Sequence, residues 1–337
     1  MRRITAIGSL VLAVVLGGCA TVPERAPLPS LAHAPVPDDA PLEDLAREAL
    51  HRDGTDQRLE RLARLDVVLE LSFTKLLVGL AEDERPPKAE IEALTSRLGH
   101  AARGAFVPER LVERTARALA EADGSREHLR ATLAFLRSDV YRRMAFARAD
   151  AETPAGQRRM ASYLSQLPNT PQDLARRDLL LRLLDATGEA ELFFRLSHDV
   201  TRRFLEAAEP AFPEWAEEPY RAFKDDASSG ADAFRAQVRK SLVLQAMYAY
   251  RKLSSGELEE AVRFWESAAG KGYARARILA VTQALEEAYV VVGERLAPGG
   301  NGVSEGDIAE QAGARADLPD VDELRQGLGR DTPREPL

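Results

Sequence analysis

Residues 42–296 consist almost wholly of strong helix formers, and this feature most constrains the fold. Alanine, leucine, arginine and glutamate dominate the stretch, and runs of β-branched residues are scarce. Such a composition favours helices over strands. Glycine, proline and capping residues predict where the helices break. The expected breaks are Asp53-Gly54, Pro86-Pro87, Pro108, Gly124-Ser125, Pro154, Thr170-Pro171, Gly188, Pro210 to Pro219, Ser229-Gly230 and Ser254. The sequence therefore predicts an all-α body.

Local patterns within this body predict particular helices. The apolar residues from Leu179 to Leu184 are too dense for a surface stripe, so we expect a buried helix there. The apolar residues from Leu62 to Leu80 predict another. Thr170, which precedes a proline, and Ser254, which precedes Glu257 by three residues, predict capped helix starts.

The first 19 residues have the order of a secretory signal. Arg2 and Arg3 precede an apolar run from Ile4 to Leu16, and a Leu-Gly-Gly-Cys box ends at Cys19. The run is shorter than the roughly 20 apolar residues that span a bilayer. The box resembles that of bacterial lipoprotein precursors, in which the cysteine thiol receives a diacylglycerol and becomes the acylated N-terminus. We therefore predict a lipoprotein signal peptide over residues 1–18 and lipidation of Cys19; the alternative is an ordinary signal peptide with an incidental cysteine.

The cysteine content and the net charge exclude several classes of function. Cys19 is the only cysteine, so its acylation leaves no disulfide, no cysteine nucleophile and no cysteine metal ligand. Removal of residues 1–18 takes two arginines and moves the formal charge from −8 to −10. Nucleic-acid binding usually needs a basic surface, so we expect no nucleic-acid partner. No later segment has the length of a membrane span, so the acyl chains are the expected attachment.

Composition also predicts the domain organisation. Residues 19–41 contain six prolines and few large apolar residues, so we expect an extended tether that reaches up to roughly 70 Å. Residues 298–337 begin with a glycine-rich stretch and continue with an acidic segment that has few core-forming residues, which predicts a disordered tail. Between them we expect a helical-hairpin bundle of two related modules, 42–170 and 171–297.

The two modules are inferred from an internal repeat. Ser125–Arg148 aligns without gaps on Ser254–Arg277, and seven of the 24 pairs are identical. The alternative is a chance likeness between amphipathic helices of similar composition. A true repeat predicts two helical modules that pack together. The identical pairs are Ser125/Ser254, Leu129/Leu258, Phe135/Phe264, Ser138/Ser267, Ala145/Ala274, Ala147/Ala276 and Arg148/Arg277.

The second copy resembles a family of bacterial envelope proteins. The segment Phe264-Trp265-Glu266-Ser267-Ala268-Ala269-Gly270 is similar to the Phe-Tyr-x-Ser-Pro-x-Gly core of the domain of unknown function 2059, with Trp265 and Ala268 departing from it. The resemblance is best over residues 240–298, and it implies a fold and a compartment but no activity. Residues 261–276 also resemble half of a Sel1-type repeat. Such solenoids need about three copies, and no further copy is found at that spacing.

The search for catalytic chemistry predicts no catalytic, cofactor-binding or metal-binding residue. No histidine stands three or four positions from another, so no paired metal face is expected, and we expect each histidine to be solvated. The sequence contains no nucleophile-elbow motif, no phosphate-binding loop and no dinucleotide-binding fingerprint. Glu266 is the most plausible catalytic acid, but Arg137 occupies its position in the other copy. The histidines are His33, His51, His100, His128 and His198.

Two features favour binding. The segment between Ser125 and Met160 contains eight arginines and only four acidic residues, which predicts a basic surface. Its candidate contacts with an anionic surface are Arg137, Arg142 and Arg143; the alternative is a solvated surface with internal ion pairs. Aromatic residues gather in the second module, where they form either its core or a groove, and the core is favoured. They are Phe193, Phe194, Trp215, Tyr248, Tyr250, Phe264, Trp265 and Tyr273.

These observations lead to one functional hypothesis and two alternatives. We expect a non-catalytic interaction or structural lipoprotein that the lipid on Cys19 anchors in the membrane, with an unidentified protein or cell-wall partner. Ala20, in place of an aspartate, implies by resemblance sorting to the outer membrane with the body in the periplasm. One alternative is a cell-wall hydrolase with two carboxyl groups about 5 to 9.5 Å apart. The other is a carrier with an apolar cavity for its ligand.

Overall fold

The computed structural model describes residues 36–37, 39–62, 87–123, 126–166 and 170–297. These residues are helical and contain no strand, which confirms the predicted all-α fold. Cys19, most of the predicted tether, the predicted tail and nearly all of the apolar segment Leu62–Leu80 lie outside the described residues.

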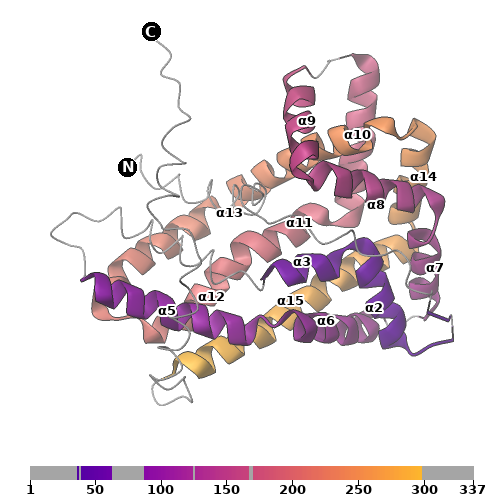
Figure 1. The fold of residues 1–337 in the computed structure, drawn as a ribbon. Coiled ribbons are helices and arrows are strands. Elements are labelled where there is room, and N and C mark those ends of the chain that lie inside the picture. Colours follow the sequence, from indigo (N-terminus) through magenta and orange to yellow (C-terminus); the bar gives the residue numbers. More distant parts are fainter. Residues whose placement is uncertain (1–35, 38, 63–86, 124–125, 167–169, 298–337) are drawn as a thin grey trace, which may run out of the picture. The chain divides into compact units, whose positions relative to one another are not determined.

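Figure 1 shows the arrangement of the described helices. A π-helical turn, η3 (Arg195–Asp199), joins α11 to α12, and two 3₁₀ turns, η4 (Glu209–Ala211) and η5 (Tyr250–Lys252), flank α13. The α-helices are α2 (Leu42–Asp53), α3 (Thr55–Arg61), α5 (Lys88–Ala105), α6 (Pro108–Asp123), α7 (Arg126–Leu136), α8 (Asp139–Glu152), α9 (Pro154–Ser165), α10 (Pro171–Thr187), α11 (Glu189–Phe194), α12 (Val200–Ala208), α13 (Glu214–Ala249), α14 (Ser255–Glu266) and α15 (Ala268–Leu296).

Helix α15 connects the two main parts of the core. Its N-terminal half packs against α7, α10 and α14, and its C-terminal half contributes to a second cluster with α5 and α12. Figure 1 shows α15 running beside α6. Its buried residues recur every three or four positions, as in a helix with one core-facing side. Several of them are alanines, which let neighbouring helices approach closely.

Several predicted helix ends are confirmed. Thr170 and Ser254 each form a capping box with the residue three positions later. Gly54 and Gly188 end α2 and α10 in the left-handed conformation, with φ of 78° and 66°, which glycine adopts without a Cβ clash. In α10, Leu180 is among the leucines buried as predicted.

The predicted breaks in the region of α13 are partly wrong. Helix α13 begins at Glu214 and continues through Pro219 and through Ser229-Gly230 to Ala249. A Cβ on Gly230 would meet nothing within 4 Å, so this glycine serves no close approach. A single glycine within a helix costs only about 1 kcal/mol relative to alanine, and the long helix tolerates that cost.

Candidate functional site

The two copies of the repeat adopt similar local structures, a helix, a corner of two residues in the first copy and one in the second, and a second helix. Ser138 forms the corner between α7 and α8, and Ser267 forms the corner between α14 and α15. Each corner serine donates its backbone N–H to the carbonyl three residues earlier at 2.9 Å. Its hydroxyl oxygen accepts from the amide three residues later at 3.2 Å. One side chain thus caps a helix as the preceding helix ends.

A third corner of this kind joins α8 to α9, and the sequence comparison missed it. The Thr153 hydroxyl accepts from the amide of Gly156 at 2.9 Å. A Cβ on Gly156 would lie 1.9 Å from the carbonyl oxygen of Asp150, and one on Gly270 would lie 2.3 Å from that of Phe264. The close crossing of the helices therefore explains the glycine at both corners. The pattern Ser/Thr-x-x-Gly after a helix was a signal that the sequence already contained.

The two repeat copies pack against each other through equivalent residues. The rings of Phe135 and Phe264, which occupy matching positions, are stacked with centroids 4.1 Å apart and an interplanar angle of 11°. Trp265 meets the Phe135 ring edge-on at 6.0 Å. Helix α7 contacts α15, and α8 contacts α14. The first helix of each copy thus packs against the second helix of the other copy. Two units related by an approximate two-fold axis pack in this way.

The second repeat copy also contains a buried arginine, whose partners come from α2, α10 and α11. Arg277 is only 1% exposed, and its guanidinium donates to Asp53 Oδ2 at 2.8 Å and to the Thr187 carbonyl at 2.7 Å. It also lies 3.3 Å from Glu189 Oε1. The hydroxyl of Tyr273 donates to the same Asp53 oxygen at 2.7 Å. The cluster ties the C-terminal ends of α2 and α10 and the start of α11 to α15.

The groups around Arg277 are held in fixed charge states. Burial by itself would raise the pKa of Glu189, but Arg58, Arg277 and Arg148 outweigh burial and lower that pKa to about 2. Arg148, the counterpart of Arg277 in the first copy, donates to the Tyr141 hydroxyl at 2.8 Å. Burial raises the pKa of Tyr141. Neither Glu189 nor Tyr141 therefore titrates near neutral pH, and the cluster suits structural support better than proton transfer.

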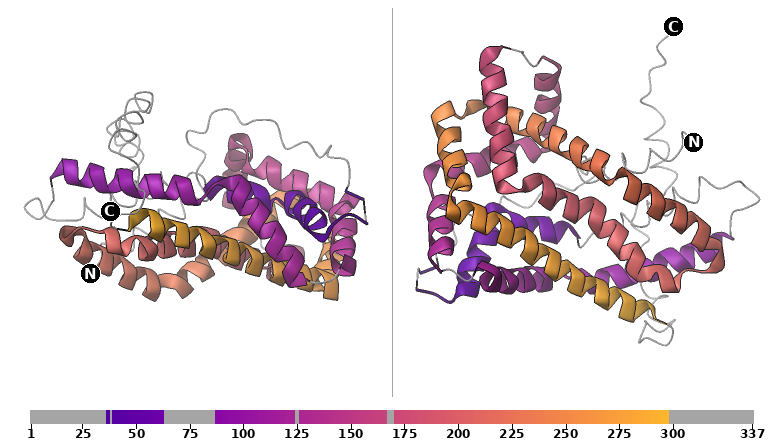
Figure 2. Two further views of the ribbon diagram at one scale, coloured as in Figure 1. Left: turned by 90° about the horizontal axis from the view of Figure 1, so that it is seen from below. Right: turned by 180° about the vertical axis from the view of Figure 1, so that it is seen from behind.

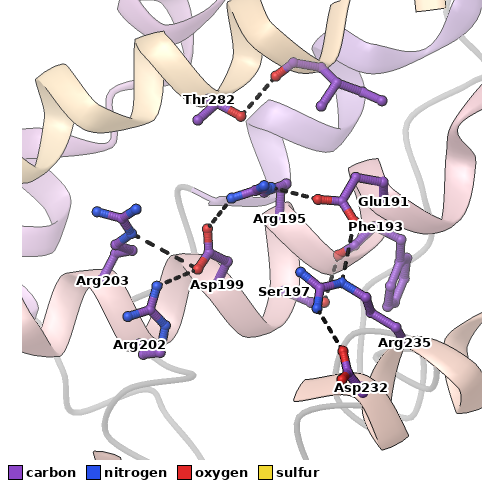
Figure 3. A network of polar contacts seen from close by, with 11 residues as sticks. Glu191, Phe193, Arg195, Ser197, Asp199, Arg202, Arg203, Asp232, Arg235 and Thr282 are labelled. Atoms are coloured by element: carbon purple, nitrogen blue, oxygen red, sulfur yellow. Dashed lines mark hydrogen bonds and ion pairs between the residues drawn. The ribbon is translucent and has the colours of Figure 1, made fainter. Parts of the chain in front are cut away.

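A second polar network surrounds the π-helical turn η3 (Figure 3). The turn is marked by a bond from the Val200 amide to the Arg195 carbonyl, five residues apart. Asp199 accepts from Arg195 at 3.0 Å and from Arg202 at 2.8 Å, and Arg203 lies 4.0 Å away. Burial opposes ionisation of Asp199, but hydrogen bonds from Arg202 and Arg195 lower its pKa. This carboxylate is thus also kept charged by its partners.

The network of the π-helical turn extends to helix α13. Arg195 pairs with Glu191 at 2.8 Å as well as with Asp199. Arg235 of α13 lies 3.4 Å from Glu191 and 3.3 Å from Asp232 (Figure 3). π-helical turns are frequent at functional sites, but here the surrounding charges pair with one another. The arrangement links α11 to α13 through Glu191 and Arg235, and links η3 to α12 through Asp199.

The expectation of solvated histidines is wrong for two of them. His51 Nδ1 lies 2.6 Å from Asp56 Oδ2 across the turn at Gly54. The imidazole of His198 contacts the rings of Phe194 and Phe234, each with a centroid separation of 5.0 Å. Asp56 and Phe194 are local partners, within one turn of the chain, whereas Phe234 is brought to His198 by the packing of α13. Within the part of the chain that the structure describes, no group of three His, Cys, Asp or Glu residues is placed to hold a metal ion.

Arg137, a predicted contact for an anionic surface, bonds inside the chain. Its guanidinium donates to Glu48 at 3.0 and 2.6 Å and to the Val36 carbonyl at 3.0 Å. The Val36 amide donates to Glu48 Oε2 at 3.0 Å. Arg137 and Glu48 thus hold both polar groups of the Val36 backbone, so this part of the predicted tether is fastened to α2 and to the residue that follows α7.

The other two predicted arginines also have acidic partners. Arg142 pairs with Asp139 on the same helix, and both side chains are exposed. Arg143 of α8 pairs with Glu257 of α14, so it links the two repeat copies. Internal pairing was the alternative to a basic binding surface. A contact of Arg142 and Arg143 with an anionic surface stays a prediction.

Glu266 and the aromatic group both have structural partners. Arg182 bonds Glu266 at 3.1 and 2.7 Å, and this hydrogen bonding lowers the pKa of Glu266. A catalytic acid needs the opposite shift. Tyr248, Trp265 and Tyr273 are buried in the first core cluster, which confirms the core interpretation for them.

Comparison with known proteins gives no relative from which to transfer a function. No family model, no curated protein and no solved structure matches the chain. The resemblance of residues 240–298 to the envelope family stays a prediction. Among the described helices, none is long and apolar enough to cross a membrane. Cys19 lies outside the described residues, and its lipidation stays a prediction.

Proposed function

We propose that this chain is a non-catalytic lipoprotein of the cell envelope, anchored at the outer membrane through the lipid on Cys19, whose body acts in the periplasm as an interaction or structural module. The observation that carries this proposal is the order of residues 1–19. A basic start, an apolar core too short for a span and a Leu-Gly-Gly-Cys box follow in sequence.

The polar chemistry of the body supports a non-catalytic role. Arg277, Glu189 and Asp199 are bonded to partners from other helices or from neighbouring turns. Their ionised forms are stabilised by these partners, whereas an acid or base catalyst must exchange its proton near neutral pH. Glu266, paired with Arg182, weighs against the cell-wall hydrolase.

We further propose that the body consists of two modules, 42–170 and 171–297, that descend from one duplicated unit. The stacking of Phe135 on Phe264 supports this, as do the contacts of α7 with α15 and of α8 with α14. Chance likeness between amphipathic helices accounts for shared composition and for the corner bond, which the corner at Thr153 also has. The reciprocal packing of the two copies is the observation that favours duplication.

The tether is proposed to run from Cys19 to Val36, where Arg137 and Glu48 hold the backbone. An extended chain over this interval reaches about 50 Å at 3.1 Å per residue. The lipid anchor would thus hold the body near the membrane and leave it free to reach a partner in the periplasm.

The anchoring is tested by fractionation of cells that express the full-length chain. Cys19→Ala is expected to release the protein from the membrane fraction, whereas Thr21→Ala, two residues along, leaves it there. Ala20→Asp is expected to move it from the outer to the inner membrane fraction. Retention of the Cys19→Ala chain in the outer membrane would contradict the proposal.

A further inference from the structure

One face of helix α15 carries exposed apolar residues that the described residues do not cover. Leu279 is 63% exposed and Val290 is 61% exposed. They are eleven residues apart, so they lie on the same side of the helix, about 16 Å from each other along its axis. Figure 2 (right) shows α15 along the near side of the molecule, beside α12. Two such side chains in line on one helix are a candidate contact surface.

Opposite charges flank the two apolar residues. Arg275 stands four positions before Leu279, and Glu294 stands four positions after Val290. Both side chains belong to exposed residues, and neither has an ion-pair partner among the described residues. Gln283 and Glu286 are both exposed between the apolar residues, and Glu286 pairs with Arg203 of α12 at 3.3 Å. The α15 face consists of a basic, an apolar, a polar, an acidic, an apolar and an acidic residue along the helix, namely Arg275, Leu279, Gln283, Glu286, Val290 and Glu294.

We propose that the α15 face binds the same face of a second copy of this chain, with the two helices antiparallel. In the antiparallel register that sets Leu279 of one copy opposite Val290 of the other, Arg275 meets Glu294 at both ends, and the amide of Gln283 lies opposite the carboxylate of Glu286. The face is therefore complementary to itself, as a two-fold symmetric interface requires. A parallel arrangement would instead set like charges against each other.

The expected dimer is weak in dilute solution and favoured on a membrane. The face from Arg275 to Glu294 is about 29 Å long at 1.5 Å per residue, and one helix pair buries less surface than a standard stable interface. Confinement of two anchored chains to one membrane raises their effective concentration. This part of the inference rests on the proposed lipidation of Cys19.

Cross-linking on membranes tests the interface directly. The full-length chain with Gln283→Cys carries one thiol besides Cys19, close to the expected two-fold axis. A short bismaleimide is expected to link it into a dimer. Gln172→Cys, an exposed position on α10, is the matched control and is expected to stay monomeric. The unmodified chain is expected to give no dimer, since an acylated Cys19 has no thiol, and a dimer there points to failed lipidation and not to a failed interface.

Charge reversal tests the register. Arg275→Glu in the Gln283→Cys chain turns two ion pairs into two repulsions, and it is expected to weaken dimerisation roughly tenfold. Adding Glu294→Arg is expected to restore it. Equal cross-linking at Gln283→Cys and Gln172→Cys, or no restoration by the double reversal, overturns the proposal. Protection of Gln283→Cys from maleimide without dimer formation also overturns it, because another partner or another part of the chain then covers the face.

Discussion

Replacement of Arg277 by methionine tests whether the buried arginine holds the helices together. Methionine keeps much of the apolar stem and removes the guanidinium. The substitution removes the bonds to Asp53, to the Thr187 carbonyl and to Glu189. The Asp53 side chain, 2% exposed, then stays buried without its cation.

The expected loss of stability follows from these contacts. Removing one partner of a buried ion pair costs about 3–5 kcal/mol, because the remaining charge is uncompensated. An unpaired buried carbonyl adds to the cost. The Tyr273 hydroxyl and the Thr55 amide still donate to Asp53, which limits the loss. We therefore expect Arg277→Met to lower the free energy of unfolding by about 3–4 kcal/mol.

Urea unfolding followed by far-ultraviolet circular dichroism measures this change, since the body is helical. Arg142→Ala is the matched control: the Arg142 side chain is 55% exposed and pairs with an exposed aspartate, Asp139. Surface pairs of this kind contribute about 0–1 kcal/mol, so the control is expected to shift the midpoint little. If Arg277→Met and Arg142→Ala lower the stability equally, Arg277 does not act as the central tie.

Further outcomes follow from the corner glycine and from the buried carboxylate. Gly270→Ala places a Cβ 2.3 Å from the Phe264 carbonyl oxygen and is expected to destabilise the fold by about 1–3 kcal/mol in the same assay. Gly256→Ala meets nothing within 4 Å and is expected to be neutral or slightly stabilising; equal effects would refute the packing argument. The folded pKa of Glu189, about 2, lies below its ordinary value of 4.5, so the stability that it contributes is present above about pH 5 and lost as the pH falls toward 2. Glu189→Gln is expected to flatten this part of the stability–pH curve, and an unchanged curve would contradict the assignment.

Local signals in the sequence predicted local structure well. Thr170 and Ser254 marked helix starts because a cap depends on residues within one turn. Gly54 marked a helix end for the same reason. The corner at Thr153 was within reach of the same reasoning, since its glycine stands where the Ser267 corner has one.

Long-range partners were beyond that reasoning. Arg277 and Asp53 are 224 positions apart, and the residues next to them in the sequence do not indicate that either one is buried. The partner of Arg137 likewise depends on how α2 packs on α7, so a basic stretch in the sequence did not reveal a tie to Glu48. The residues of the π-helical turn η3 form no sequence pattern that distinguishes them from residues of an α-helix. Such features arise from tertiary packing, which periodicity does not encode.

The mass of the N-terminal peptide of the mature chain tests the central claim most directly. The account predicts that this peptide begins at Cys19 and carries a diacylglyceryl group on the thiol and an acyl group on the amine. A mature peptide that begins elsewhere, or a Cys19 with an unmodified thiol, would contradict the proposed anchoring and the role in the envelope that depends on it.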